Sequence, residues 1–183
     1  MRKLKHHEKK LLKKVNLYDW KSDDNVREVR ILRRYRIQNR EDYVSYNRLT
    51  GKIRKLSAKL KLLDETDIIR KKITKELLLK LYNLGVIKTI KSLEQCDRIP
   101  ASAFCRRRLP VIMQMSKMAE NLKEATTLVE QGHVRVGPNT IIDPAFLVTR
   151  TMEDYVTWVP GSKIKKHILE YNDNFDDFDF DQI

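Results

Sequence analysis

The chain has 183 residues, 41% of them hydrophobic and 34% charged, and a formal net charge of +13 at pH 7. This length allows one or two small domains with a modest core. A transmembrane helix, a secretory signal and a disulfide framework are not expected, because the sequence has no window of 18 apolar residues, no apolar N-terminal stretch and only two cysteines.

Residues 1–25 are predicted to form a basic N-terminal arm. Eight lysines and arginines lie within residues 1–21, with leucines interleaved among them. This pattern fits a short amphipathic helix from His7 to Val15, and it equally fits an arm that orders only on RNA. Tyr18 and Trp20 would either anchor the arm to a protein surface or stack on a base.

Residues 26–101 are predicted to be a helical region. Four apolar residues spaced three or four apart predict a helix over residues 41–63. They are Ile53, Leu56, Leu60 and Leu63. The acidic residues 64–67 then offer N-cap side chains for a second helix, which should end at Gly85. We expect two antiparallel helices packed on each other with solvated basic outer faces, followed by a connector over residues 86–101.

The third predicted region, residues 102–169, begins close to a triple arginine, Arg106-Arg107-Arg108. Ser102 is a candidate N-cap for a helix that carries these arginines. Pro110 lacks the N–H that would bond to residue 106, so this helix either kinks there or begins later. Successive helical residues turn by about 100°, so at most two of the arginines would face one partner together.

A second helix in this region is predicted from Asn121 to Gln131. Asn121 is a favoured N-cap with Glu124 in the capping-box position, and Gly132 ends the helix. Its buried face is expected to consist of four apolar residues. They are Leu122, Ala125, Leu128 and Val129.

Short strands should follow this helix. Alternation after Gly132 places Val134 and Val136 on one side and His133 and Arg135 on the other, as in a half-buried strand. Gly137-Pro138-Asn139 predicts a turn, Ile141 and Ile142 predict a second strand, and residues 154–159 predict a last one. The expected fold class is therefore α+β and mostly α, with a short antiparallel sheet.

Residues 170–183 form an acidic tail that we expect to be disordered. The tail has six acids and no lysine or arginine, which leaves +19 on the other 169 residues. Three phenylalanines lie between the acids, so the tail could dock on a partner or fold back on the basic body. A body of this charge favours nucleic acid as a partner, although basic proteins also bind acidic proteins or membranes.

The sequence offers no arrangement that predicts catalysis, a cofactor or a metal. A catalytic His133 would need a nucleophile and an orienting partner, and nothing at a fixed spacing supplies them. The adjacent His6 and His7 have no further ligands at metal-binding spacing. The five glycines are not clustered into a phosphate-binding loop. Arginine, by contrast, presents a planar fork of donors that suits phosphate oxygens and stacks on unpaired bases.

Part of the third region resembles the S-four-type RNA-binding domain, also called the αL motif. The matching residues are Arg107-Arg108-Leu109, Ala125, Leu128-Val129, Gly132-His133-Val134 and Val136. That domain occurs in a small-subunit ribosomal protein, several pseudouridine synthases and some tyrosyl-tRNA synthetases. The resemblance implies RNA binding and leaves the biological process open.

Longer strings are similar to the Imp-three family, components of the U-three small nucleolar ribonucleoprotein. They are residues 2–20, Tyr35-Arg36-Ile37-Gln38-Asn39-Arg40-Glu41-Asp42-Tyr43, Cys105-Arg106-Arg107-Arg108-Leu109-Pro110 and Met152-Glu153-Asp154-Tyr155-Val156-Thr157-Trp158. The resemblance implies a nucleolar, and hence nuclear, protein of the small-subunit processome. Such a protein works with M-phase phosphoprotein ten and Imp-four. It helps U-three RNA to pair with pre-ribosomal RNA for early 18S rRNA processing.

The resemblance also implies an RNA-contact surface. Carried onto this chain, that surface is Arg106, Arg107, Arg108, Lys117, Lys123, His133 and Arg135. Two positions depart from the usual pattern, because many such domains have a basic residue in place of Thr126 and Asn-Gly in place of Gly137-Pro138-Asn139. We therefore expect the surface to depend on the first helix and the residue 132–136 edge more than on the second helix.

Three other functions are alternatives to a role in the small-subunit processome. A permanent small-subunit ribosomal protein could carry the same domain and would stay in mature subunits. A protein-interaction adaptor could use the basic faces to bind acidic partner segments. An RNA-modifying enzyme would need a catalytic domain, and residues 1–101 hold no recognisable catalytic set.

Overall fold

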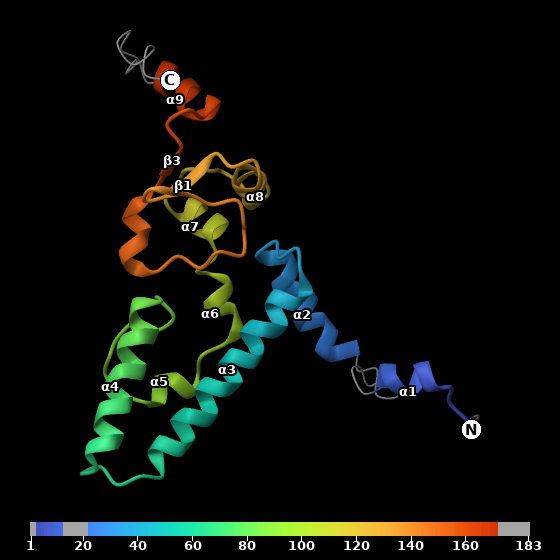
Figure 1. The fold of residues 1–183 in the computed structure, drawn as a ribbon, viewed down its shortest axis with the longest axis vertical. Coiled ribbons are helices and arrows are strands. Elements are labelled where there is room, and N and C mark those ends of the chain that lie inside the picture. Colours follow the sequence, from blue (N-terminus) through green and yellow to red (C-terminus); the bar gives the residue numbers. More distant parts are fainter. Residues whose placement is uncertain (1–2, 13–21, 172–183) are drawn as a thin grey trace. The chain divides into compact units, whose positions relative to one another are not determined.

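The computed structural model describes residues 3–12 and 22–171 (Figure 1), and it falls into two compact units, Met1–Arg34 and Tyr35–Ile183. The first unit contains α1 (His6–Leu12) and α2 (Ser22–Arg34). The predicted amphipathic helix is thus present over residues 7–12. Its remainder, Tyr18, Trp20 and the tail beyond Tyr171 lie outside the described residues.

Helix α3 (Arg40–Lys61) is the first long helix of the second unit. Its buried residues recur every three or four positions and are Tyr46, Thr50, Ile53, Ser57 and Leu60. Two members of the predicted stripe, Leu56 and Leu63, are instead about 40% exposed. The inward-facing stripe contains two aliphatic hydroxyls because each finds an acceptor: Thr50 donates to the Asn47 carbonyl at 2.7 Å and Ser57 to the Leu93 carbonyl at 3.3 Å.

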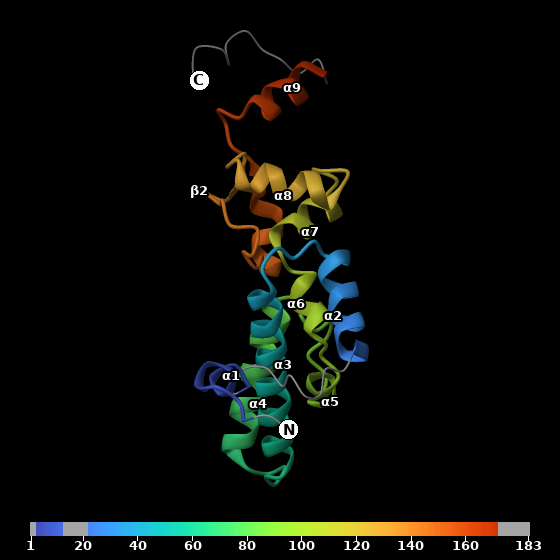
Figure 2. The ribbon, with the colours of Figure 1, turned by 90° about the vertical axis from the view of Figure 1, so that its right-hand side faces the viewer.

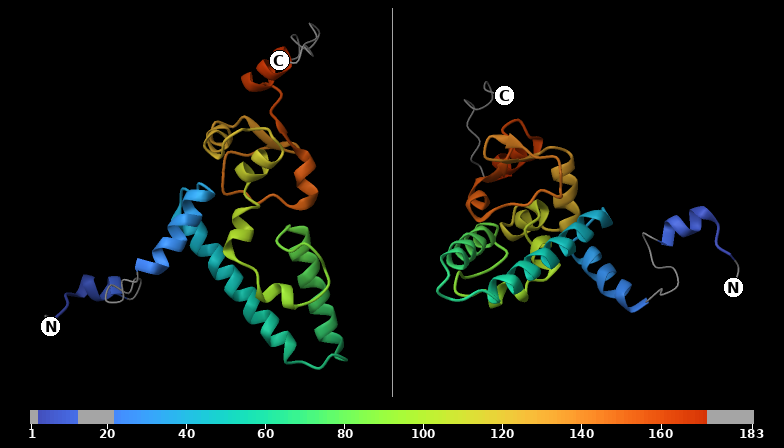
Figure 3. Two further views of the ribbon diagram at one scale, coloured as in Figure 1. Left: turned by 180° about the vertical axis from the view of Figure 1, so that it is seen from behind. Right: turned by 60° about the horizontal axis from the view of Figure 1, so that its bottom comes forward.

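Helix α4 (Ile68–Asn83) follows the turn at residues 62–67. Asp67 caps it by accepting from the Ile69 N–H at 3.0 Å, as the acidic break predicted. The expected direct packing of α3 on α4 is wrong. Figures 1 and 3 show the two helices diverging, with the following segment between them, and α3 packs mainly on α5 (Glu94–Asp97) and α6 (Ala101–Cys105).

The C-terminal half of this unit is a small α+β core. Helix α7 (Leu109–Met115) packs on α8 (Leu122–Glu130), and Figure 2 shows the two together. A three-stranded antiparallel sheet completes it in the order β2-β1-β3, with β1 at Val134–Val136, β2 at Asn139–Thr140 and β3 at Val156–Trp158. Ten buried side chains from the helices, the sheet and their connections form one cluster, which includes fully buried residues such as Leu109, Val129 and Val134. The predicted α+β, mostly α fold is confirmed.

Several predicted boundaries need correction. The arginines do not lie on a helix, because α6 ends at Cys105 and α7 begins at Leu109 with Pro110 in its first turn. Proline is tolerated there because the N–H groups of a first helical turn have no intrahelical partner. Residue Pro100, and not Ser102, is the N-cap of α6. The second strand is Asn139–Thr140, just before the predicted Ile141 and Ile142.

Two further helices complete the description. A 3-10 helix, η1 (Arg150–Tyr155), leads directly into β3. Helix α9 (Lys163–Tyr171) follows β3, buries none of its residues and was not predicted from the sequence. Among the described residues, no helix combines the length and apolar character needed to cross a membrane.

Candidate nucleic-acid interface

Arg108 lies inside the protein and not on its surface. Its side chain is 3% exposed, and its Nη1 donates to Asp42 Oδ2 of α3 at 2.9 Å and to the Tyr46 hydroxyl at 3.5 Å. Tyr46 in turn stacks on Phe104, with ring centroids 5.9 Å apart. Burial raises the pKa of Tyr46 above its usual value, and the Arg108 charge opposes that rise. Arg108 therefore joins α3 to the α+β core and presents no donors to RNA.

Arg107 is also committed to internal contacts. Its Nε and Nη2 donate to the Val148 carbonyl at 2.9 and 2.5 Å, and its Nη1 pairs with Glu153. The side chain is 11% exposed, and its guanidinium lies directly against Gly85, which ends α4. The expectation that Arg107 and Arg108 belong to the RNA surface is corrected for this reason.

Arg106 is the one arginine of the three that faces outward. Its side chain is exposed, and its Nε makes one long hydrogen bond of 3.4 Å to the Ser102 carbonyl. The three side chains point to different places because they lie in the irregular link between α6 and α7. The arginine triplet therefore supplies one surface cation, and its other two arginines are bound to partners inside the protein.

Lys117 and Lys123 are both exposed, at the two ends of the link between α7 and α8. Lys117 has φ +60°, a left-handed conformation that is costly for a residue with a Cβ. It occupies this position because its N–H bonds the Gln114 carbonyl and the Met118 N–H bonds the Met113 carbonyl, which closes the end of α7. Lys123 lies in the first turn of α8, where the helix dipole adds to its positive potential.

Arg135 lies between the two buried valines of β1, as predicted, and His133 directly precedes that strand; both side chains are only partly exposed. The His133 Nδ1 and the Ser162 Oγ form a hydrogen bond of 2.9 Å, and Ser162 Oγ also accepts from the Ile164 N–H at 3.3 Å. Arg135 Nε donates to Thr157 Oγ1 of β3 at 3.0 Å. His133 thus fixes the start of α9, while the terminal guanidinium nitrogens of Arg135 make no hydrogen bond within the described part of the chain.

The structure also explains one departure from the usual pattern of the domain. Thr126 is 3% exposed, and its hydroxyl donates to the Leu122 carbonyl at 2.7 Å. A basic residue in its place would be buried, so Thr126 does not remove a surface cation from α8. Lys123 remains the basic residue of that helix.

Two basic features were not found in the sequence. Arg150 places its guanidinium 4.1 Å from the centre of the Tyr82 ring and donates to the Ile87 carbonyl at 2.8 Å. Like Arg108, it joins the helical part to the α+β core. Helix α9 adds Lys163, Lys165 and Lys166 on an amphipathic segment, a signal that Ile164 and Ile168, four residues apart, could have given.

The described residues contain no group of three histidine, cysteine or carboxylate side chains that could hold a metal ion. Cys96 and Cys105 are free and buried. Burial raises the pKa of the Cys105 thiol to about 11, and its Sγ lies 3.4 Å from the Ala101 carbonyl. Both cysteines therefore act as core side chains.

Two protein-family models match adjacent parts of the chain, and the boundary between them lies between Arg106 and Arg107. Residues 3–106 match the Ribosomal protein S4/S9 N-terminal domain, and residues 107–154 match the S4 domain, the S-four-type domain expected from the sequence. A yeast protein, the Saccharomyces cerevisiae U3 small nucleolar ribonucleoprotein protein IMP3, is 57% identical over 98% of this chain and 99% of its own length. The human protein of the same name is 55% identical over 99% of each chain.

The chain belongs to the IMP3 family. The predicted membership is thereby confirmed. The chain also matches the small ribosomal subunit protein uS4 of Hyperthermus butylicus, with 29% identity over 84% of this chain and 86% of that protein. The S4 domain of this chain begins at Arg107, so the two internal arginines, Arg107 and Arg108, lie at the start of that domain.

Proposed function

We propose that the chain is an RNA-binding component of the U3 small nucleolar ribonucleoprotein that works by binding and not by catalysis. The observation that carries this proposal is the full-length identity to yeast and human proteins of that name. Its finer role would be to assist pairing of U3 RNA with pre-ribosomal RNA in the small-subunit processome. This would occur in the nucleolus during early 18S rRNA processing.

Three exposed cations of the α+β core and one partly exposed arginine supply the proposed RNA surface. The exposed ones are Arg106, Lys117 and Lys123, and the partly exposed one is Arg135. Arg106 and Lys117 flank α7, a seven-residue helix about 10 Å long, so they can contact separate phosphates. By neutralising phosphates on two RNA segments, these side chains would lower the repulsion that opposes their pairing. His133 contributes indirectly, by holding the start of α9 and its lysines.

The partners implied by the family resemblance form part of the same proposal. M-phase phosphoprotein ten and Imp-four would join this chain and U3 RNA in one assembly. Purified proteins mixed with U3 RNA and run on a sizing column would test this, since co-elution is required.

The salt dependence of U3 RNA binding tests the proposed surface. We expect the log of the association constant to fall linearly with log salt, because bound phosphates release counterions. Lys123→Gln should lower the steepness of this line by about 0.7–0.9, the contribution of one phosphate contact. Lys117→Gly should do the same and also stabilise the fold by about 0.5–1 kcal/mol, because glycine relieves the left-handed backbone.

Lys55→Gln is the matched control, since it removes one exposed charge from α3, outside the proposed surface. Its slope should equal that of the unmodified chain. Binding that does not depend on salt, or equal slope changes in all three variants, would contradict the proposed surface.

The match to uS4 supports a second candidate, a permanent protein of the small ribosomal subunit. Sedimentation of cell extracts separates the two candidates. A processome component should be absent from mature small subunits and polysomes, whereas a ribosomal protein should remain in both.

A further inference from the structure

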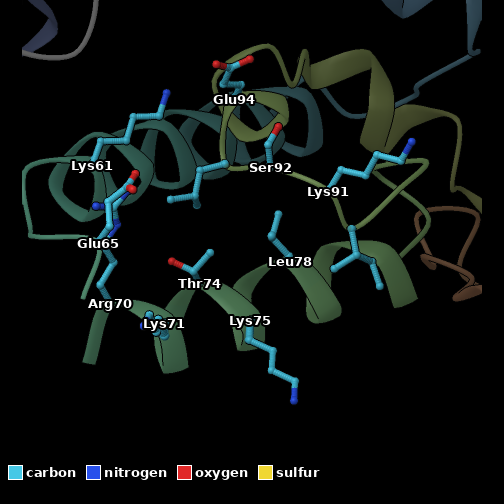
Figure 4. Close-up of a pocket in the computed structure, with 12 residues that line it drawn as sticks. Lys61, Glu65, Arg70, Lys71, Thr74, Lys75, Leu78, Lys91, Ser92 and Glu94 are labelled. Atoms are coloured by element: carbon cyan, nitrogen blue, oxygen red, sulfur yellow. The ribbon is translucent and has the colours of Figure 1, made fainter. Parts of the chain in front are cut away.

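A groove of about 670 Å³ opens where α3 and α4 diverge, a size typical of ligand sites. Its walls are the end of α3, one face of α4 and the segment of residues 90–94. In Figure 4, Thr74 and Leu78 point from α4 into the space, and Ser92 lies on the opposite wall. None of the residues that line the groove is aromatic.

The interior of the groove is mainly aliphatic. Leu78 and Leu93 are less than 10% exposed, and Ile90 is 43% exposed. Thr74 adds one polar atom, because its buried hydroxyl has no hydrogen-bond partner in the described part of the chain. A buried hydroxyl usually has a partner, so Thr74 is an exception in the wall of the groove.

Exposed aliphatic side chains continue from the groove around the α3–α4 turn. Leu62 is 87% exposed, Ile68 81% and Ile69 61%. They are close neighbours in sequence of Lys61, Glu65 and Arg70, which line the groove. Adjacent exposed aliphatic residues of this size are typical of a protein-binding surface.

The charges around the groove are mainly positive. Two of its basic residues already have acidic partners, since Lys61 pairs with Asp97 and Arg70 with Glu65. Lys71, Lys75 and Lys91 have no ion-pair partner among the described residues, and they outnumber the one remaining acid, Glu94. An acidic occupant is therefore favoured.

The residues that line the groove favour one kind of occupant over RNA and extended peptides. Single-stranded RNA binds by stacking its bases on aromatic side chains, which this groove lacks. The walls are helices and a loop, with no sheet edge to which an extended peptide could add a strand. An amphipathic helix with apolar residues three and four apart suits such walls, and acids on its flanks suit the lysines.

We propose that the groove between α4 and residues 90–94 binds an acidic amphipathic helix of a partner protein, with aliphatic side chains against Leu78, Ile90 and Leu93. This inference goes beyond the proposed RNA role and does not rest on it. RNA contacts would use the α+β core, which leaves the groove available for assembly with protein.

The test uses the full chain and a synthetic helical peptide with leucines at positions i, i+3, i+4 and i+7 and glutamates on the flanks. Fluorescence anisotropy measures its affinity, and amide shifts of the isotope-labelled chain locate it. We expect shifts at residues 68–78 and 90–94. Lys75→Glu with Lys91→Glu should weaken binding about tenfold, because two attractive contacts become repulsive.

A matched double reversal, Lys55→Glu with Lys80→Glu, changes two exposed lysines that do not line the groove and should weaken binding less than about threefold. A peptide with serine for leucine should not bind. The proposal is overturned if the leucine peptide does not bind or shifts other residues. It is also overturned if deleting residues 172–183 strengthens binding tenfold, which would make the tail the occupant, or if U3 RNA shifts the groove residues.

Discussion

Replacing Arg108 with alanine should destabilise the protein by about 3 kcal/mol. The substitution leaves the Asp42 carboxylate without its cation in a site where that carboxylate is only 25% exposed. It also removes the donor to the Tyr46 hydroxyl and the charge that favours the ionised form of that tyrosine. Urea unfolding followed by circular dichroism measures the change in free energy.

Arg106→Ala is the control for this result, because it removes the same side chain two residues away. Arg106 is exposed, so its loss should change stability by less than about 0.5 kcal/mol and should weaken U3 RNA binding instead. The reverse outcome, a stable Arg108→Ala protein with weakened RNA binding, would show that Arg108 contacts RNA after all.

Replacing Gly85 with alanine should cost about 2–4 kcal/mol of stability, through two effects. Gly85 has φ +73°, and a Cβ there would lie 2.8 Å from the Arg107 guanidinium. The guanidinium cannot move away without losing its bonds to the Val148 carbonyl and its pairing with Glu153. Thermal and urea unfolding both report the loss.

Gly51→Ala is the matched glycine substitution. Gly51 lies within α3, and a Cβ at that position meets no atom within 4 Å. Alanine should therefore stabilise the helix by about 0.5–1 kcal/mol. Equal effects of the two substitutions would mean that the contact between Gly85 and Arg107 contributes nothing to stability.

Local signals in the sequence predicted much of the fold. Gly132 ends α8 because its φ of +74° allows it and the next residue to bond back to the Val129 and Leu128 carbonyls. The alternation of Val134 and Val136 correctly predicted β1 and its buried face. Such features depend on neighbours within a few residues, which the sequence displays directly.

The roles of the arginines could not be predicted, because their partners are distant in the sequence. Asp42 is 66 residues from Arg108, while Val148 and Glu153 are 41 and 46 residues from Arg107. From the sequence alone, an arginine next to a helix is interpreted as a surface cation, because its hydrogen-bond acceptors are not known. The same reason applies to Ser57, whose acceptor is the Leu93 carbonyl 36 residues away.

The structure divides the basic residues of this chain into internal and surface groups. Arg108 and Arg150 join the helical part to the α+β core through acceptors inside one unit, whereas Arg107 bonds to acceptors within the core itself. Arg106, Lys117 and Lys123 remain at the surface, where we propose that they contact RNA. A sequence count of basic residues cannot separate these two groups, whereas burial does.

Crosslinking of the chain to U3 RNA in cells, followed by mass spectrometry of the attached peptides, tests the central proposal most directly. We expect U3 nucleotides to attach to peptides containing Arg106, Lys117, Lys123 or Arg135. We expect none on the α4 segment that lines the groove. Attachment confined to α3 and α4, or the absence of U3 RNA among the attached nucleotides, would contradict it.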